Sequence, residues 1–164
     1  MSTLKVDTIQ KTNGSAPTLA DLSISHAGSI LQTKFTQTST EVTVAGTTWT
    51  DSGLSLAITP KATSSTILVV AGCCFDVETA DNASIRILRD STNIHEQAYM
   101  AYSSATGWHI ERDFVQYEDS PSTTSAITYK VQFQRTTGDS TLYMNYDDSG
   151  KESLSSLTLM EIAG

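Results

Sequence analysis

The longest apolar stretch of the chain lies near its middle, at residues 64–75, and reads SSTILVVAGCCF. It is too short to cross a membrane as a helix, and its β-branched residues disfavour a surface helix. A strand covered on both faces has this composition. The stretch therefore predicts the central strand of a β-sheet, around which the rest of the chain packs.

Elsewhere, apolar and polar residues alternate in short segments that are separated by turn residues. The clearest alternation is at residues 127–135, which is typical of an antiparallel strand with one buried face. Residues 156–162 are apolar on both sides, so we expect a second central strand there. Other strands are expected at residues 29–36, 41–44, 54–58, 83–89, 94–100, 107–117 and 141–146.

These short strands with frequent turns predict an all-β fold, an antiparallel β-sandwich. Within this class the pattern favours a jelly roll that assembles as a trimer, because the first long strand and the last are apolar on both faces. The pattern leaves an immunoglobulin-like sandwich open as an alternative. No segment has a helical period long enough to predict a substantial helix.

The first 28 residues are polar and contain few apolar side chains, so they cannot bury enough surface to fold alone. We therefore predict an N-terminal attachment segment or linker at residues 1–28 and a β-sandwich head domain at residues 29–164. The segment is expected to dock on a partner protein or on further copies of the chain. Its candidate anchoring side chains are Leu4, Val6 and Ile9.

Charge and cysteine content narrow the range of partners. Ten basic and 18 acidic residues give a formal net charge of −8, which repels both nucleic-acid phosphates and anionic membrane surfaces. The start of the sequence lacks the apolar region of a signal peptide. Cys73 and Cys74 are adjacent, and neighbouring strand residues point to opposite faces, so we predict two buried free thiols in a chain that folds in a reducing cytoplasm.

One strand carries a pattern that has a catalytic or metal-binding interpretation. His109, Glu111 and Asp113 share one face of the strand predicted at residues 107–117, and none of the three histidines has a partner at metal-ligand spacing. We favour a solvated polar face, which leaves the opposite face apolar. The apolar side chains of that opposite face are Trp108, Ile110 and Phe114.

Other candidates for chemistry are weaker. The acidic residues at 147–152 lack the ligand order of a calcium loop and read as a hairpin turn. Asp76, Glu78 and Asp81 are expected to be solvated carboxylates rather than a glycosidase pair. The sequence has no nucleophile elbow and no glycine-rich phosphate loop. We therefore predict no catalytic residue, no cofactor, no metal and no enzymatic activity.

Aromatic residues gather beside small polar ones at residues 97–108, which is a composition that suits a recognition surface. Tyr99, Tyr102 and Trp108 are the candidate receptor-binding residues of this loop. The alternative is that these rings are core or interface residues at strand ends, because they bury so much area.

Four segments, taken in order, resemble one family. They are STLKVDTIQ at residues 2–10, ITPKATSSTILV at 58–69, ILRDSTNI at 87–94 and SLTLMEIA at 156–163. Similar segments occur in virion structural proteins of the tail-fibre-like or appendage type from phages of marine bacteria and cyanobacteria. The set spans almost the whole chain; Thr66 stands where lysine is commoner in the family.

This resemblance implies a non-enzymatic structural protein of a phage virion, usually a homotrimer of β-structured heads. The N-terminal segment would join other virion proteins of the tail or capsid, and the protein would be made in the host cytoplasm and released by lysis. The short chain favours a small knob or short fibre, which would display its head for attachment to a host-surface glycan or protein. A capsid decoration or head-fibre protein and a glycan-binding receptor module are the alternatives, and a polysaccharide hydrolase is the least favoured. Neither nucleic-acid binding nor membrane insertion is expected.

Overall fold

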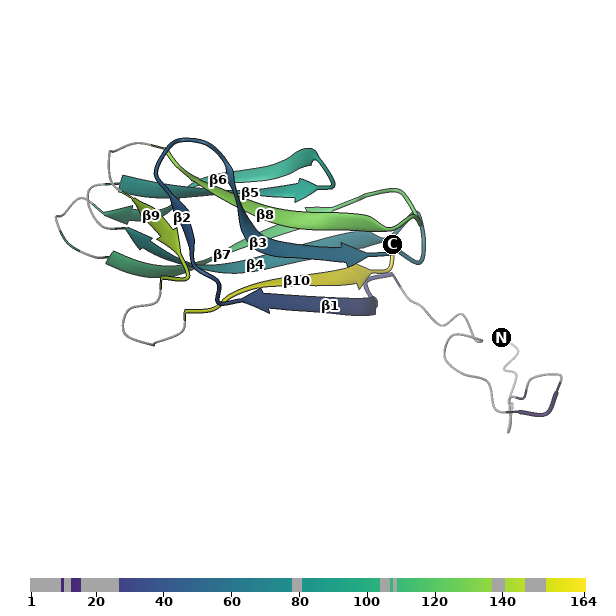
Figure 1. The fold of residues 1–164 in the computed structure, drawn as a ribbon. Coiled ribbons are helices and arrows are strands. Elements are labelled where there is room, and N and C mark those ends of the chain that lie inside the picture. Colours follow the sequence, from purple (N-terminus) through teal and green to yellow (C-terminus); the bar gives the residue numbers. More distant parts are fainter. Residues whose placement is uncertain are drawn as a thin grey trace, which may run out of the picture.

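The computed structural model describes residues 10, 13–15, 27–77, 81–103, 107, 109–136, 141–146 and 153–164. In this part of the chain ten strands form two antiparallel sheets that face each other, so the predicted all-β antiparallel sandwich is confirmed (Figure 1). No helix long and apolar enough to cross a membrane occurs in these ranges. The strands are β1 (Ile30–Thr38), β2 (Val42–Val44), β3 (Thr50–Ile58), β4 (Thr66–Val77), β5 (Asp81–Arg89), β6 (Thr92–Ser103), β7 (His109–Asp119), β8 (Ile127–Arg135), β9 (Leu142–Met144) and β10 (Ser155–Ile162).

Sheet A is organised around β4, the long apolar strand. On one side β10 pairs with the first half of β4 and β9 with its last three residues, while β7 runs along the whole of the other side. The order is β1-β10-β4-β9-β2, with β7 beyond β4, whereas sheet B has the order β3-β8-β5-β6. The prediction that both β4 and β10 are central strands is therefore confirmed.

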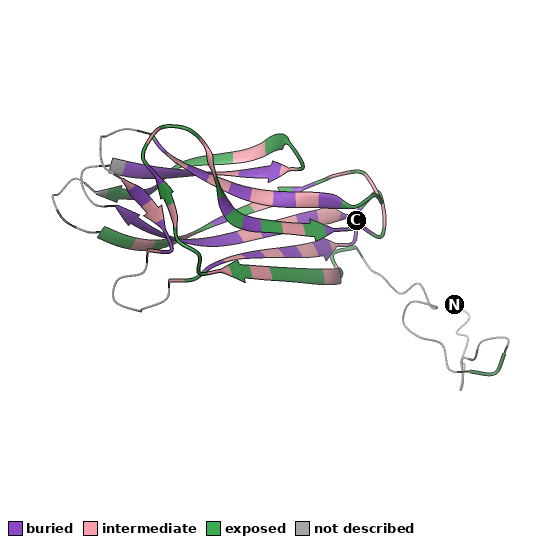
Figure 2. Cartoon of the chain, in the orientation of Figure 1, coloured by how far each residue is buried: buried purple, intermediate pink, exposed green. Residues whose placement is uncertain are grey.

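The core lies between the sheets, and β4 contributes one alternating set of side chains to it. Ile67, Val69 and Phe75 belong to this inward set and are completely buried, whereas Leu68 and Val70 point the other way and are half-buried. The Phe75 ring packs against Phe133 of β8, with ring centroids 6.0 Å apart. Bands of buried and less buried residues alternate along the strands, as a two-residue period requires (Figure 2).

Tight turns with unusual backbone conformations join the strands at one end of sheet B. Asp90, between β5 and β6, has a positive φ of 55°, a region that aspartate tolerates better than most residues. Its N–H donates to the Thr128 carbonyl at 2.7 Å, and its carboxylate accepts from the Thr128 N–H at 2.9 Å. The β5–β6 hairpin is thus fixed to the start of β8.

The described part of the sandwich begins and ends at the same place. Gly28 N–H donates to the Ala163 carbonyl at 2.7 Å, and Ala163 N–H donates to the Ser29 carbonyl at 2.9 Å. These two bonds extend the β1–β10 ladder beyond Ile30 and Ile162. Residues 28 and 163 therefore lie side by side, at the end of the molecule where β4 starts.

Candidate functional surfaces

The candidate attachment residues Leu4, Val6 and Ile9 lie outside the described residues, so their role stays a prediction. The strand register does fix where the preceding chain enters the sandwich. Ile30 pairs with Ile162, which pairs with Thr66, so all three share one end of sheet A. The other end of β4, at Val77, lies about 35 Å from Thr66, because β4 is an extended strand of 12 residues.

Two of the three candidate receptor-binding residues are exposed on β6, near that opposite end. The side chains of Tyr99 and Tyr102 are 68% and 57% exposed, so neither is a core residue of this chain. The backbone of Tyr102 pairs with Asn82, one residue from the start of β5. The third candidate, Trp108, lies outside the described residues.

A bulge in β6 holds Tyr99 in place. Between the pairs Ala83–Ala101 and Ile85–Gln97, one residue of β5 faces three residues of β6. This bulge sends Met100 into the core and leaves Tyr99 in solvent with a φ of 60°. Such a conformation is unfavourable for a bulky residue, by about 1–3 kcal/mol, and it re-aims the side chain.

The polar face of β7 is solvated, as predicted, because the side chains of His109 and Glu111 are 47% and 34% exposed. His109, Glu111 and Asp113 pair with Val77, Phe75 and Cys73 and so share the side of the sheet that faces the core. Because β7 is an edge strand, these side chains reach its open margin. There, His109 Nε2 lies 2.6 Å from Glu111 Oε1. Among the described residues, no group of three or more histidine, cysteine or acidic side chains is placed to hold a metal ion.

The apolar face predicted for this strand exists, but it points outward. Ile110 is 63% exposed and Phe114 is 57% exposed. Alternation along a strand shows that two faces differ, but it does not show which one meets the core. The expectation of a solvated Asp76 is wrong, because Asp76 is 2% exposed within β4. Glu78 lies outside the described residues, and the side chain of Asp81 does too.

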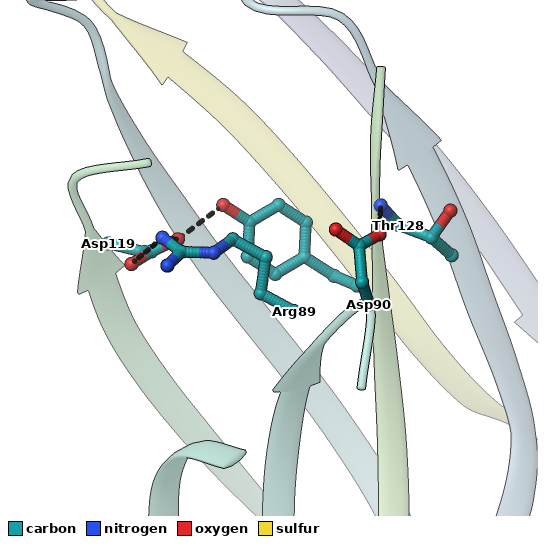
Figure 3. A network of polar contacts seen from close by, with 5 residues as sticks. Arg89, Asp90, Asp119 and Thr128 are labelled. Atoms are coloured by element: carbon teal, nitrogen blue, oxygen red, sulfur yellow. Dashed lines mark hydrogen bonds and ion pairs between the residues drawn. The ribbon is translucent and has the colours of Figure 1, made fainter. Parts of the chain in front are cut away.

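A buried polar cluster joins the two sheets where β5, β7 and β8 come together (Figure 3). Arg89 Nη1 donates to both carboxylate oxygens of Asp119, at 2.9 and 2.8 Å, and the Tyr129 hydroxyl donates to Asp119 Oδ2 at 2.7 Å. Burial, and the hydrogen bond to the carboxylate, raise the pKa of Tyr129 above its ordinary value. The phenol therefore stays a donor at neutral pH, and the cluster acts as a clamp between sheets.

The two cysteines behave as predicted. Both are free and buried, and Cys73 points into the core while Cys74 lies on the opposite side of β4. Burial raises the pKa of the Cys73 thiol to about 12, with smaller contributions from Cys74 and Asp113. A thiol with so high a pKa is a poor nucleophile, which fits a packing role.

The sequence predicted apolar residues on both faces of β4 and β10 but did not show which face of β4 points away from the core. The outer face of sheet A comprises the side chains of β1, β10, β4 and β7 that point away from sheet B. Its apolar members come from all four strands, and its exposed charges among the described residues of those strands are Arg112 and Glu118. Phe114 lies over Gly72, where an added Cβ would come within 2.7 Å of its ring. The apolar members are Ile30, Phe35, Leu68, Val70, Ile110, Phe114, Met160 and Ile162.

The outer face of sheet B differs in character, because its side chains bond to one another. Arg86 stacks over Trp49, 4.6 Å from the ring centroid, and its Nε donates to Gln132 Oε1 at 2.7 Å. Gln132 Nε2 donates in turn to Asp51 Oδ1 at 2.6 Å. The polar side chains of Asp51, Arg86 and Gln132 on this face are therefore bonded to one another.

Comparison with known proteins gives no family assignment. No family model matches the chain, and no curated protein matches it. Among solved structures, it is similar to the VP2 subviral particle of infectious bursal disease virus, with a TM-score of 0.35 and 11% identity over 83% of this chain and 39% of that one. It is also similar to a point mutant of that virus's VP2 in T=1 particles, with a TM-score of 0.35 and 14% identity over 82% of this chain and 37% of that one. The chain thus spans well under half of either VP2 chain.

Proposed function

We propose that this chain is a non-enzymatic structural protein of a phage virion, a short fibre or tail-fibre-like appendage. Residues 1–28 attach it to tail or capsid proteins, and the sandwich is its outward head. The resemblance of its four segments to phage appendage proteins supports this assignment. Three of these segments belong to the sandwich: residues 58–69 lead from β3 into β4, residues 87–94 form the β5–β6 hairpin, and residues 156–163 form β10.

The observation that carries the proposal is that the attachment segment and the exposed Tyr102 lie at opposite ends of the head. Residue 28, where the attachment segment joins the sandwich, lies beside residue 163 at one end. The exposed Tyr102 lies near the other end, about 35 Å away along the strands. A head tethered through residues 1–28 would therefore present this tyrosine away from the particle.

The strand order supports the jelly-roll form of the sandwich. The four long strands of sheet A run β1-β10-β4-β7, and the four strands of sheet B run β3-β8-β5-β6. Each neighbouring pair in sheet A has its chain continuation as a pair in sheet B, which is how a long double ribbon rolls into two sheets. We also propose that the head is a homotrimer, as the resemblance implies.

Attachment is tested by changing Leu4, Val6 and Ile9 together to serine in the full chain. We expect a folded protein, judged by its circular dichroism, that no longer enters particles in an infection complementation assay. The matched control changes Lys5, Asp7 and Thr8 to serine in the same segment and should enter particles normally. Normal incorporation of the first variant would refute the attachment role. Immunogold labelling of particles would distinguish a tail appendage from a capsid decoration.

A second role, binding of a host-surface glycan or protein, is favoured by the strained and exposed Tyr99. Rings that stand in solvent can stack on the apolar faces of sugars or of partner side chains. Tyr99→Ala combined with Tyr102→Ala should abolish adsorption to host cells while the oligomeric state is unchanged. Leu154→Ala, which trims an exposed apolar side chain elsewhere, is the control. Unchanged adsorption of the double variant would exclude this role, and release of reducing ends from host envelope would contradict the non-enzymatic assignment.

A further inference from the structure

The outer face of sheet A is an apolar surface that no described residue covers. Ile30, Phe35, Ile110 and Phe114 are each more than half exposed on this face. Single exposed apolar residues are normal, but here they come from both edge strands of a face whose centre holds Leu68, Val70 and Met160, with Thr158 and Gln116 between them. An apolar surface of this extent marks a place that another molecule covers. Its position is visible in Figure 1 as the side of β1, β10, β4 and β7 that faces away from β3, β8, β5 and β6.

We propose that this face packs against further copies of this chain in the assembled protein. The inference rests on the proposed homotrimer and names its contact surface. The half-buried Leu68, Val70 and Met160 occupy the centre of the face, and the exposed rings and isoleucines lie around them. The inward side chains of β4 are buried in the core between the sheets, so only its outward side chains can contact another copy.

Charge favours a copy of the same chain as the occupant. The chain carries a net charge of −8, so most of its surfaces repel one another when copies approach. On the outer face of sheet A, the exposed charges among the described residues of its four long strands are Arg112 and Glu118, which cancel, and the remaining acidic side chain of the face, Asp76, is buried at 2% exposure. This face is therefore one where acidic copies can meet without like-charge repulsion.

The area is sufficient for a specific contact. Four strands about 4.8 Å apart and about 30 Å long present roughly 600 Å² per copy, so three copies that turn this face to a common axis bury up to about 1,800 Å² in all. Stable interfaces bury about 1,000 Å² or more in total.

The packing of Phe114 over Gly72 also has a purely intramolecular explanation, since aromatic rings cover glycines in sheets. That explanation does not extend to Ile30, Phe35 or Ile110.

The test measures the oligomeric state of the full chain by light scattering coupled to size-exclusion chromatography. The protein should have the mass of three chains. Phe114→Glu and Ile110→Glu should each weaken association by about 100-fold or more, because a carboxylate would be buried without a partner. Tyr102→Glu is the matched control, since Tyr102 is as exposed as Phe114 but lies on β6; it should leave the trimer intact.

Each outcome separates the two proposals. A trimer that both face variants leave intact would refute the contact surface while the trimer stands. A wild-type protein that stays monomeric at high concentration would refute both the trimer and this contact, and it would assign the face to a different protein of the particle. Unfolding of Phe114→Glu would leave Ile110→Glu to decide, because Ile110 covers no glycine. Neither result changes the test of particle attachment through residues 1–28.

Discussion

Replacing Asp119 with alanine removes the carboxylate that joins β7 of sheet A to β5 and β8 of sheet B (Figure 3). The Arg89 side chain is 28% exposed and can regain water, so loss of its ion pair is expected at the lower end of about 1.5–3 kcal/mol. Tyr129 is fully buried, and its hydroxyl would lose its acceptor at a cost of about 1–3 kcal/mol. We therefore expect the free energy of unfolding to fall by about 3 kcal/mol.

Urea unfolding followed by circular dichroism measures this change. The transition midpoint should fall while the dependence of the unfolding free energy on urea stays the same. Tyr129→Phe removes one hydrogen bond but leaves the ion pair, so it should cost only about 1 kcal/mol. Glu118→Ala, which removes the neighbouring exposed carboxylate, should change stability by less than about 0.5 kcal/mol. A cost for Asp119→Ala no larger than that of Glu118→Ala would refute the role of the clamp.

Three further predictions concern other buried groups. Burial raises the pKa of Glu161, but hydrogen bonds from Gln32 and the Lys61 N–H, with the Lys61 charge, outweigh it and lower the pKa below its ordinary value near 4.5. The Glu161 carboxylate therefore contributes its full stability above pH 4.5, and this contribution is lost as the pH falls through the lowered pKa. Glu161→Gln should make the free energy of unfolding, measured by urea titration, fall less steeply at acid pH. An acid profile equal to that of the wild type would contradict this role of Glu161. Cys73 should resist iodoacetamide in the native protein and react after unfolding in guanidinium, as mass spectrometry would show; rapid native labelling would refute its burial. Gly72→Val should destabilise the protein because its Cβ would meet the Phe114 ring, and adding Phe114→Ala should recover part of the loss in thermal denaturation; no recovery would place the strain elsewhere.

The sequence predicted strand positions accurately where residues alternate with a period of two and one face of the strand is fully buried. The strand expected at residues 127–135 is β8 with the same bounds, and the one expected at 156–162 differs from β10 by one residue. At β7 the same alternation separated a polar face from an apolar one, but it did not show that this edge strand turns its apolar side outward. The strand expected at residues 141–146 is shorter in the structure, where β9 ends at Met144 and Tyr146 lies just beyond it, half-buried.

The sequence predicted the candidate surfaces only in part, because strand register and contacts between distant residues do not appear in local patterns. The aromatic content of residues 97–108 pointed to Tyr99 and Tyr102, and both are exposed. The bulge that strains Tyr99 depends on the register against β5, which no local pattern encodes. The clamp joins Arg89 to a carboxylate 30 positions away, and such a pairing follows from the fold alone. The expected Leu4, Val6 and Ile9 anchors and Trp108 stay predictions.

The position of β10 has a consequence for how the protein is made. β10 lies between β1 and β4, so sheet A cannot close until residues 155–163 have left the ribosome. Until then β1 has no partner in its sheet, and the apolar edge of β4 that β10 will cover stays open. Such an edge can pair with other nascent chains. Efficient synthesis should therefore depend on chaperones that shield this edge, and any shortened product that lacks β10 should aggregate rather than accumulate as a partly folded head.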